Sequence, residues 1–396
     1  MNAPSVSDVV DDLPALRAAY SRFLTGDRAL LTGHSHQAWP DVARDALLLS
    51  FDDAARFVDD KWDQAIFPMI DRVGAKILAR MGFDAGDSIA FGKSTHELVF
   101  RLLTCFPAAA RPRIVTTTGE FHSLHRQLAR LVEEGADVVW VPAEPREGLA
   151  ERLLAAITPG TAMVAFSAVL FEDAHVVPRL GEIAARAVSV GAVPLVDAYH
   201  AFNAVPIAWG PAQDQLFVTA GGYKYAEFGD GICWLRIPRD TTLRPVDTGW
   251  FADFAALSAP RALTVAYGPG GARFSGATFD ASAMYRADAV LAHWERFGLT
   301  VPRLRAISLR QTRRIVAHLD AHGRAADVLS SRDDASRGGF VTVRHDAAGA
   351  IVGQLRAQGV FTDARRDRLR LGPAPYLTDA EIDRGVLAAI EAMARA

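Results

Sequence analysis

Apolar runs of strand length recur through the middle of the chain and alternate with longer amphipathic segments. After a short run at Ser88–Phe91, strands are predicted at Arg113–Thr117, Ala136–Val141, Ala162–Ser167, Ala192–Val196, Leu216–Ala220 and Gly231–Ile237. Segments with helical spacing, such as Ser123–Glu134 and Pro178–Val190, lie between them. This alternation predicts an α/β fold with a mainly parallel, seven-stranded-type sheet that helices cover on both faces.

Helical periodicity marks both ends of the chain. Helices are predicted at Leu13–Leu24, Asp41–Val58 and Trp62–Met81, and past Gly298 at Arg303–His322 and from Thr378, with strands at Phe340–Arg344 and near Val360 and Leu369. We therefore expect an N-terminal segment (1–35) that packs with the small domain, a large domain (36–297), and a smaller α+β C-terminal domain (298–396). Within the last, Ser331–Gly339 is the segment predicted to be a flexible loop.

Composition excludes several classes of protein. With 396 residues, half of them hydrophobic, the chain can bury a large core. Its net charge of −3 gives no general attraction to nucleic acid or to an anionic membrane, so neither partner is expected. The start of the chain lacks the basic and apolar regions of a signal peptide, and no apolar run has membrane-spanning length. A cytoplasmic protein is expected.

Cysteine and histidine spacing suggests neither disulfides nor metal. Cys105, expected in a helix, and Cys233, expected in a strand, are far apart in sequence and have apolar neighbours. Two histidine pairs have ligand-like spacing, at positions 34 and 36 and at positions 122 and 125, but no third and fourth ligands accompany them. We therefore predict no metal site.

Two of the predicted strands deliver ionisable side chains at their ends. Asp197 follows the strand that ends at Val196, with His200 three residues later, and Lys224 follows the strand Leu216–Ala220 after two glycines. A lysine amine that can form a Schiff base and an aspartate that can hold a pyridinium nitrogen are the pair that pyridoxal 5′-phosphate (PLP) chemistry requires. Taken singly, the aspartate would most often be a capping or salt-bridging carboxylate and the lysine a solvated surface residue.

A possible phosphate site lies at the turn between the first predicted strand and the next helix. Ser94, Thr95 and His96 open this helix, and Ser94 has the capping-box spacing to Glu97. The N–H groups at a helix N-terminus, together with hydroxyls, bind phosphate well. The simpler explanation is an N-cap alone, but the position at the carboxyl end of a strand favours a ligand site.

Two further side chains could complete such a site. Phe121 follows the strand Arg113–Thr117 and could stack on a flat cofactor ring, although a lone phenylalanine is usually core. Arg370 lies in a strand pattern, and its guanidinium suits a substrate carboxylate, with a surface ion pair as the alternative.

These motifs together resemble the class V aminotransferase superfamily of PLP fold type I, and within it the kynureninase-like branch. The resemblance extends over most of the chain, and its most specific parts are the Asp-x-x-His and Tyr-Lys-Tyr motifs. The matching segments are Leu31–Ser35, Val196–Pro206, Gly221–Tyr225, Gly229–Gly231, Gly249–Phe251 and Arg273–Thr278.

The resemblance implies a role for each site residue. Lys224 would carry the cofactor as an internal aldimine, Asp197 would bind the ring nitrogen, and His200 would lie near the phenolic oxygen. Further cofactor contacts are implied for Phe121 on the ring, for Ser94, Thr95, His96 and Tyr223 at the phosphate, and for Trp250 and Thr278 across a subunit boundary. Arg370, with His34 and Ser35, would bind the substrate. A homodimer with shared active sites follows.

The implied activity is that of a PLP enzyme acting on a small amino-acid substrate through an external aldimine and a quinonoid. A kynureninase-like C–C hydrolase or lyase, or related chemistry at Cβ or Cγ, is the main expectation. A class V aminotransferase is the alternative. Two less favoured hypotheses remain: a cysteine desulfurase or lyase, and a non-catalytic protein with the same fold. The desulfurase is disfavoured because it needs a thiol on a mobile loop.

Overall fold

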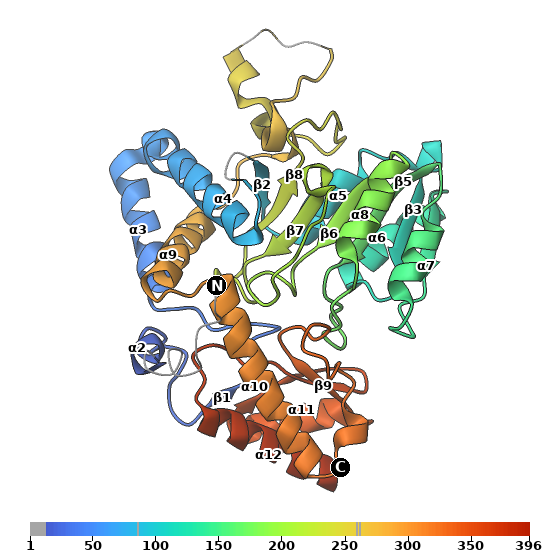
Figure 1. Ribbon diagram of the computed structural model, residues 1–396. Helices are drawn as coiled ribbons and strands as arrows, with labels where there is room; N and C mark the ends of the chain where they lie inside the picture. Colours follow the sequence, from blue (N-terminus) through green and yellow to red (C-terminus); the bar gives the residue numbers. More distant parts are fainter. Residues whose placement is uncertain (1–12, 85–86, 259, 261–262) are drawn as a thin grey trace.

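The computed structural model describes residues 13–84, 87–258, 260 and 263–396. A seven-stranded sheet in the order β2-β8-β7-β6-β5-β3-β4 forms its centre (Figure 1). Neighbouring strands from β7 to β4 pair in parallel, whereas β8 is antiparallel to both β7 and β2. The strands are β2 Ser88–Gly92, β3 Arg113–Thr117, β4 Asp137–Val141, β5 Thr161–Ser167, β6 Val193–Asp197, β7 Phe217–Gly221 and β8 Cys233–Ile237. The predicted α/β fold with a mainly parallel sheet is confirmed.

Helices cover both faces of this sheet because each strand is apolar on both sides. Along β5, for example, Met163 packs with the core under α5 (Thr95–Leu103) and α6 (His122–Glu133). Its neighbour Val164 points to the opposite core, which lies under α7 (Leu149–Ala156) and α8 (Leu180–Ser189). This two-residue alternation is what a sheet buried on both faces requires.

A further helical group lies beside the β2 edge of the sheet (Figure 1). It contains α3 (Val42–Phe57), α4 (Phe67–Met81) and α9 (Ser282–Arg296). The sequence pattern predicted one helix over Trp62–Met81, but its first turn, Trp62–Ile66, is a π-helix. The predicted Leu13–Leu24 helix is also shorter, because α2 ends at Ala18 and continues as turns.

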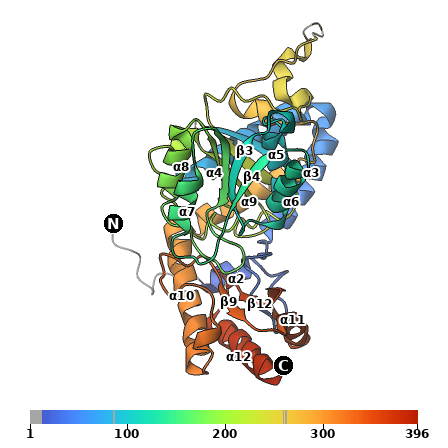
Figure 2. The same ribbon diagram turned by 90° about the vertical axis from the view of Figure 1, so that its right-hand side faces the viewer.

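The C-terminal part forms a separate layer below the large sheet (Figures 1 and 2). Its three-stranded antiparallel sheet has the order β11 (Asp363–Arg365), β12 (Arg368–Leu371), β9 (Val341–Arg344). Its helices are α10 (Val301–Ala321), α11 (Ala348–Ala357) and α12 (Asp379–Arg395), and Thr378 with Glu381 forms a capping box at the start of α12. Within the described residues, no helix has both the length and the apolar character needed to cross a membrane.

The N-terminal strand joins this C-terminal part. β1 (Ala29–Leu30) pairs in parallel with β10 (Val360–Phe361), and Thr32 continues the pairing with Gly372. Residues 34–39 then run along the loop that carries Lys224, where the backbone N–H of Gln37 donates to the carbonyl of Tyr223 (3.1 Å). The division of the chain into domains remains a prediction, but these contacts place β1 within the C-terminal layer and the residues after it against the Lys224 loop.

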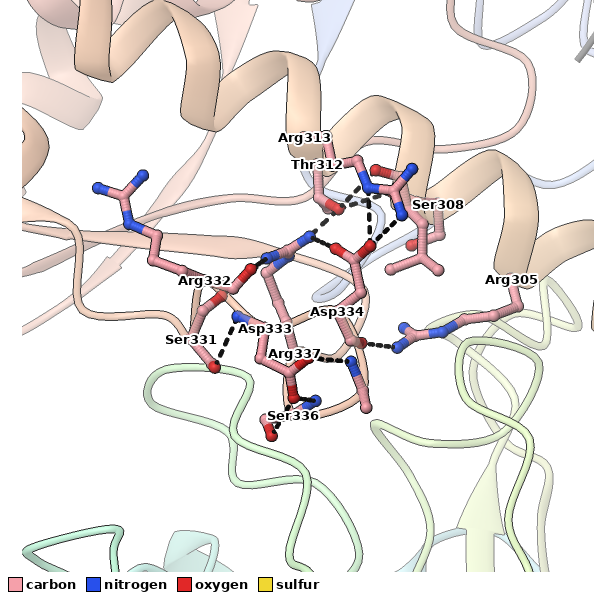
Figure 3. Close-up of polar contacts among 12 residues, drawn as sticks. Arg305, Ser308, Thr312, Arg313, Ser331, Arg332, Asp333, Asp334, Ser336 and Arg337 are labelled. Atoms are coloured by element: carbon pink, nitrogen blue, oxygen red, sulfur yellow. Dashed lines mark hydrogen bonds and ion pairs between the residues drawn. The ribbon is translucent and has the colours of Figure 1, made fainter.

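The loop Ser331–Gly339, predicted to be flexible, is instead held by many polar contacts (Figure 3). Arg337 is buried, donates to the carbonyls of Ser331 and Arg332, and forms an ion pair with Asp334. Arg313 on α10 also pairs with Asp334. The polar residues of this loop therefore form hydrogen bonds and ion pairs that hold it in place. The sequence alone did not indicate this because some of the partners lie on α10.

Candidate active site

Asp197 and Lys224 line one pocket at the carboxyl edge of the large sheet. Asp197 is the last residue of β6, and Lys224 follows β7, which is the parallel neighbour of β6. The carboxyl ends of parallel strands meet at one sheet edge, so strand order alone brings the two groups together. Eight other residues line the same pocket: Thr95, Phe121, Ser167, Val169, Phe171, Tyr199, His200 and Tyr223.

The Lys224 amine is buried among aromatic rings. Its Nζ lies 2.9 Å from Nε2 of His200. It also lies over the ring of Tyr199, 4.2 Å from the centroid, and over the ring of Phe121 at 5.2 Å. Burial lowers the pKa of Lys224 to about 7, because the charged form loses its hydration, while Asp197 opposes this shift and Arg370 adds to it. A large fraction of the amine is therefore neutral and nucleophilic near pH 7.

Asp197 lines the pocket, and one of its carboxylate oxygens is hydrogen-bonded. The backbone N–H of Tyr199 donates to its Oδ1 (2.8 Å). Burial raises the pKa of Asp197, whereas this hydrogen bond and the charge of Lys224 oppose the shift. A carboxylate in such a site is stabilised by a cationic partner in the pocket.

His200 is neutral and incompletely bonded. Burial, followed by the positive charges of Lys224 and Arg370, lowers its pKa well below the ordinary histidine value. Its Nε2 contacts Lys224, while its Nδ1 is buried without a hydrogen-bond partner among the described residues. A buried polar atom of this kind is costly unless a ligand or water satisfies it.

The α5 edge of the pocket matches the predicted phosphate site only in part. Thr95 lines the pocket, and Ser94 is the N-cap of α5, whose Oγ accepts from the N–H of Glu97 (3.2 Å). His96 is exposed and its ring bonds to Gln127. The capping function that sequence offered as the simpler explanation for Ser94 is therefore present, and His96 does not line the pocket.

The C-terminal part packs against two residues that line the pocket, Phe171 and His200. The buried Arg370 donates from Nε to Oδ1 of Asp363 (3.0 Å) and from Nη1 to the carbonyl of Phe171 (2.6 Å), and its Nη2 also bonds Asp363. Nε2 of His34 lies 2.8 Å from Oδ1 of the same carboxylate. The ring of Phe340 stacks on His34 with centroids 4.5 Å apart and lies 5.6 Å from the His200 ring. Residues from the N-terminal strand, the small sheet and the large sheet thus meet here.

His34 and Asp363 differ in their protonation. Burial lowers the pKa of His34 to about 4, so the ring is neutral and donates to Asp363. Burial favours a neutral Asp363, but its hydrogen bonds with His34 and Arg370, together with the charge on Arg370, outweigh it and lower the pKa of the carboxyl. Asp363 therefore stays ionised and fixes the plane of the Arg370 guanidinium.

Seven predicted residues do not line this pocket: Ser94, His96, His34 and Arg370, described above, and also Ser35, Trp250 and Thr278. Ser35 donates its hydroxyl to the carbonyl of Thr32. Trp250 is 45% exposed and belongs to an aromatic cluster with Phe251 and Phe254, and Thr278 is exposed. Figure 1 shows the Trp250 segment at the end of the large layer farthest from the C-terminal part. Within one chain the last three residues do not meet the Lys224 pocket.

Sequence reasoning missed several groups in and around the pocket. Tyr199 lies inside the Asp-x-x-His motif, and Asp363 was not singled out, although its partner Arg370 follows only seven residues later; its other partner, His34, is far away in sequence. Glu120, buried at the end of β3, accepts from the hydroxyls of Thr117 and Ser167 at 2.6 Å each. Burial raises the pKa of Glu120 to about 7. Its position just before Phe121 was the only available hint.

The pocket residues fit PLP on structural grounds. A buried amine with a depressed pKa suits Schiff-base attachment, and a carboxylate that pairs with no cation among the residues described suits a pyridinium nitrogen. Within the described part of the chain, Nδ1 of His200 has no hydrogen-bond partner, so this buried atom is free to bond a ligand or a water molecule. Phe121 and Thr95 supply an aromatic face and a hydroxyl at the same pocket.

Comparisons with known proteins agree with this description. Residues 304–388 match the family model of the kynureninase C-terminal domain. The chain is 25% identical over 321 residues to a kynureninase of Deinococcus radiodurans, which covers 80% of this chain and 76% of that protein. It is 23% identical over 350 residues to a kynureninase of Geobacillus thermodenitrificans, covering 81% and 78% respectively.

Solved structures share the architecture at lower identity. A variant of a cystine C–S lyase, solved with glycine covalently linked to its PLP cofactor, is 17% identical with a TM-score of 0.80 and covers 95% of this chain and 99% of that chain. A cysteine desulfurase from Thermococcus onnurineus is 17% identical with a TM-score of 0.74, covering 100% and 99%. The resemblance is therefore confirmed: the chain has the α/β fold of PLP fold type I and is similar to kynureninases and to structures of the class V aminotransferase superfamily.

Proposed function

We propose that this protein is a PLP-dependent enzyme that acts on an amino acid, and that its specific reaction is hydrolysis of a Cβ–Cγ bond of the kynureninase type. The observation that carries the proposal is the shared pocket of Lys224 and Asp197, in which the lysine amine also lies against His200. Similarity to two kynureninases supports the specific reaction.

When bound, PLP supplies an electron sink that stabilises negative charge next to the substrate amine. Lys224 holds the cofactor, and its amine, once free, accepts the proton from the substrate α-carbon. The pKa of about 7 suits this task because a base works best when its pKa is near the working pH. The ionised Asp197 holds the protonated ring nitrogen, and the ring Nδ1 of His200 is available to the ligand.

Substrate binding is assigned to the C-terminal side of the pocket. Asp363 engages Nε and Nη2 of Arg370 and so fixes the guanidinium plane. The carbonyl of Phe171 takes one N–H of Nη1, so one N–H on each Nη atom remains to bind an α-carboxylate. His34 and Phe340 pack beside it and exclude water. Hydrolysis adds water across the cleaved bond: Cβ keeps the electron pair and gains a proton, and the acyl carbon gains the hydroxyl group.

Cysteine desulfuration is less well supported by the thiols of this chain. Cys105 lies in the turn after α5 and not in the helix, which corrects the sequence prediction, and Cys233 lies in β8. Burial raises the pKa of Cys105 to about 12 and that of Cys233 to about 11. Neither thiol is therefore the low-pKa, exposed group that sulfur transfer needs.

We also propose a homodimer that shares active sites, with Trp250 and Thr278 directed to the partner. Large apolar side chains are exposed on α3 and around η5 (Trp250–Ser258), including Leu49, Phe51 and Leu257. Exposed apolar surface of this extent is typical of an interface. Light scattering during gel filtration should give twice the monomer mass, and a monomer would contradict the proposal.

The first experiment is reductive trapping of PLP on the purified protein, followed by peptide mass spectrometry. We expect the modification at Lys224 in the unaltered protein and in the control variant Lys93→Ala. It should be absent in Lys224→Ala. Turnover of an aryl-ketone amino acid with release of alanine supports hydrolysis. If a keto acid is needed to restore the cofactor, the protein is an aminotransferase, and PLP binding without any turnover would indicate the non-catalytic alternative.

A further inference from the structure

Tyr199 occupies a prominent place in the pocket that neither sequence motif assigned. It follows Asp197 by two residues, is only 6% exposed, and lines the pocket together with Phe121. Nζ of Lys224 lies 4.2 Å from the centroid of the Tyr199 ring and 5.2 Å from that of Phe121. The reactive amine is therefore placed over the faces of two aromatic rings.

The neighbouring strands are built around the Tyr199 ring. A Cβ atom on Gly221 would lie 2.5 Å from both Cζ and the hydroxyl of Tyr199 and 2.4 Å from Sγ of Cys233. Only glycine leaves room for the ring at this position of β7. The Tyr199 hydroxyl lies 3.9 Å from Sγ of Cys233, and the Tyr223 ring packs with its centroid 5.1 Å away. Packing therefore fixes the ring against the end of the sheet.

We propose that Tyr199 is a positioning residue that forms a second aromatic wall of the cofactor site, so that a flat coenzyme bound at Lys224 packs between Tyr199 and Phe121. The inference rests on the proposed function. Its physical basis is the preference of aromatic rings for offset contact with another ring, in addition to the apolar area that the contact buries.

Position also distinguishes this role from simple core packing. A ring that served only to fill the sheet edge would turn its face to apolar neighbours, whereas the face of Tyr199 is directed to the Lys224 amine. The backbone N–H of Tyr199 also donates to Oδ1 of Asp197 (2.8 Å). The same short segment thus positions both the carboxylate and the ring.

The test measures cofactor affinity of the apoprotein and does not depend on turnover. Two ligands are used: PLP, and pyridoxamine 5′-phosphate, which has the same ring but cannot condense with the Lys224 amine. Tyr199→Leu should weaken binding of pyridoxamine 5′-phosphate about twofold to tenfold, the range expected for one lost aromatic contact. Tyr199→Phe keeps the ring and should stay within about twofold of the unaltered protein.

A matched control removes a ring from elsewhere in the core. Phe166 is fully buried on β5 and does not line the pocket, so Phe166→Leu should lower thermal stability without changing affinity for pyridoxamine 5′-phosphate. Visible circular dichroism of bound PLP adds a second readout, which should change in Tyr199→Leu and return in Tyr199→Phe. If Tyr199→Leu does not fold, Tyr199→Met is judged by the same criteria because its flexible side chain fills the space.

The outcomes separate this inference from the proposed function. If the unaltered protein does not attach PLP to Lys224, both ideas fail. If it does, but Tyr199→Leu binds pyridoxamine 5′-phosphate as tightly as the unaltered protein, only the second aromatic wall is refuted. An equal loss in Tyr199→Phe would assign the effect to the hydroxyl group and would also overturn the inference.

Discussion

The reactivity of Lys224 should follow a pKa about three units below that of an ordinary lysine. Burial is the main cause of the depressed pKa of about 7, with Arg370 adding to it and Asp197 opposing it. At pH 7 about half of the amine is then neutral, compared with roughly one part in 2,500 for a free lysine of pKa about 10.4. This thousandfold difference makes the pH profile a sensitive test of the pocket.

Reductive methylation of the apoprotein, quantified for each lysine by mass spectrometry, provides the assay. The chain has only four lysines, so Lys61, Lys76 and Lys93 act as internal controls. Because burial slows access of the reagent, the shape of the profile matters and the absolute rate does not. The rate for Lys224 should rise through a midpoint near pH 7.

Two charge variants should move this midpoint in opposite directions. Asp197→Asn removes the negative charge that favours the ammonium form, so the midpoint should fall. Arg370→Leu removes a positive charge, so the midpoint should rise. A midpoint near 10 in the unaltered protein, or shifts of the same sign in both variants, would refute the electrostatic account.

Three further predictions concern stability. Glu227, buried beside Tyr20 and Trp294, has a pKa raised to about 7 by burial. Its contribution to folding stability is therefore present below about pH 4.5 and is lost as the pH rises through 7. Urea unfolding should show a loss of about 3 kcal/mol in the free energy of unfolding over this range, and this loss should be absent in Glu227→Gln. Asp363→Ala leaves Arg370 buried without its carboxylate and should lower the free energy of unfolding by about 3 kcal/mol near neutral pH. A loss below about 1 kcal/mol would contradict the idea that Asp363 holds the Arg370 guanidinium in place. Asp334→Ala should cost about 1–3 kcal/mol in the same assay by removing a partner of the buried Arg337, and an unchanged urea midpoint would contradict the bonded loop.

Much of the large layer was predictable because its information is local. Each β strand is a short apolar run that ends at a turn, and a parallel sheet collects the ends of such runs at one edge. The sequence therefore indicated both that Asp197 and Lys224 lie together and what chemistry they share. The start of the last helix at Thr378 was likewise predicted, and the structure shows that Thr378 caps it together with Glu381.

Long-range pairing decided the rest. His34 comes from the opposite end of the chain to Asp363, so their hydrogen bond has no trace in local spacing, whereas Asp363 and Arg370 are paired within the β11–β12 hairpin. The pKa of Lys224 depends on burial, which only the assembled layers create. The room for Tyr199 depends on Gly221 in a neighbouring strand. The sequence by itself determined the elements and the reactive pair, whereas tertiary structure decided the surroundings, because burial and electrostatic interaction depend on distance in space and not on separation along the chain.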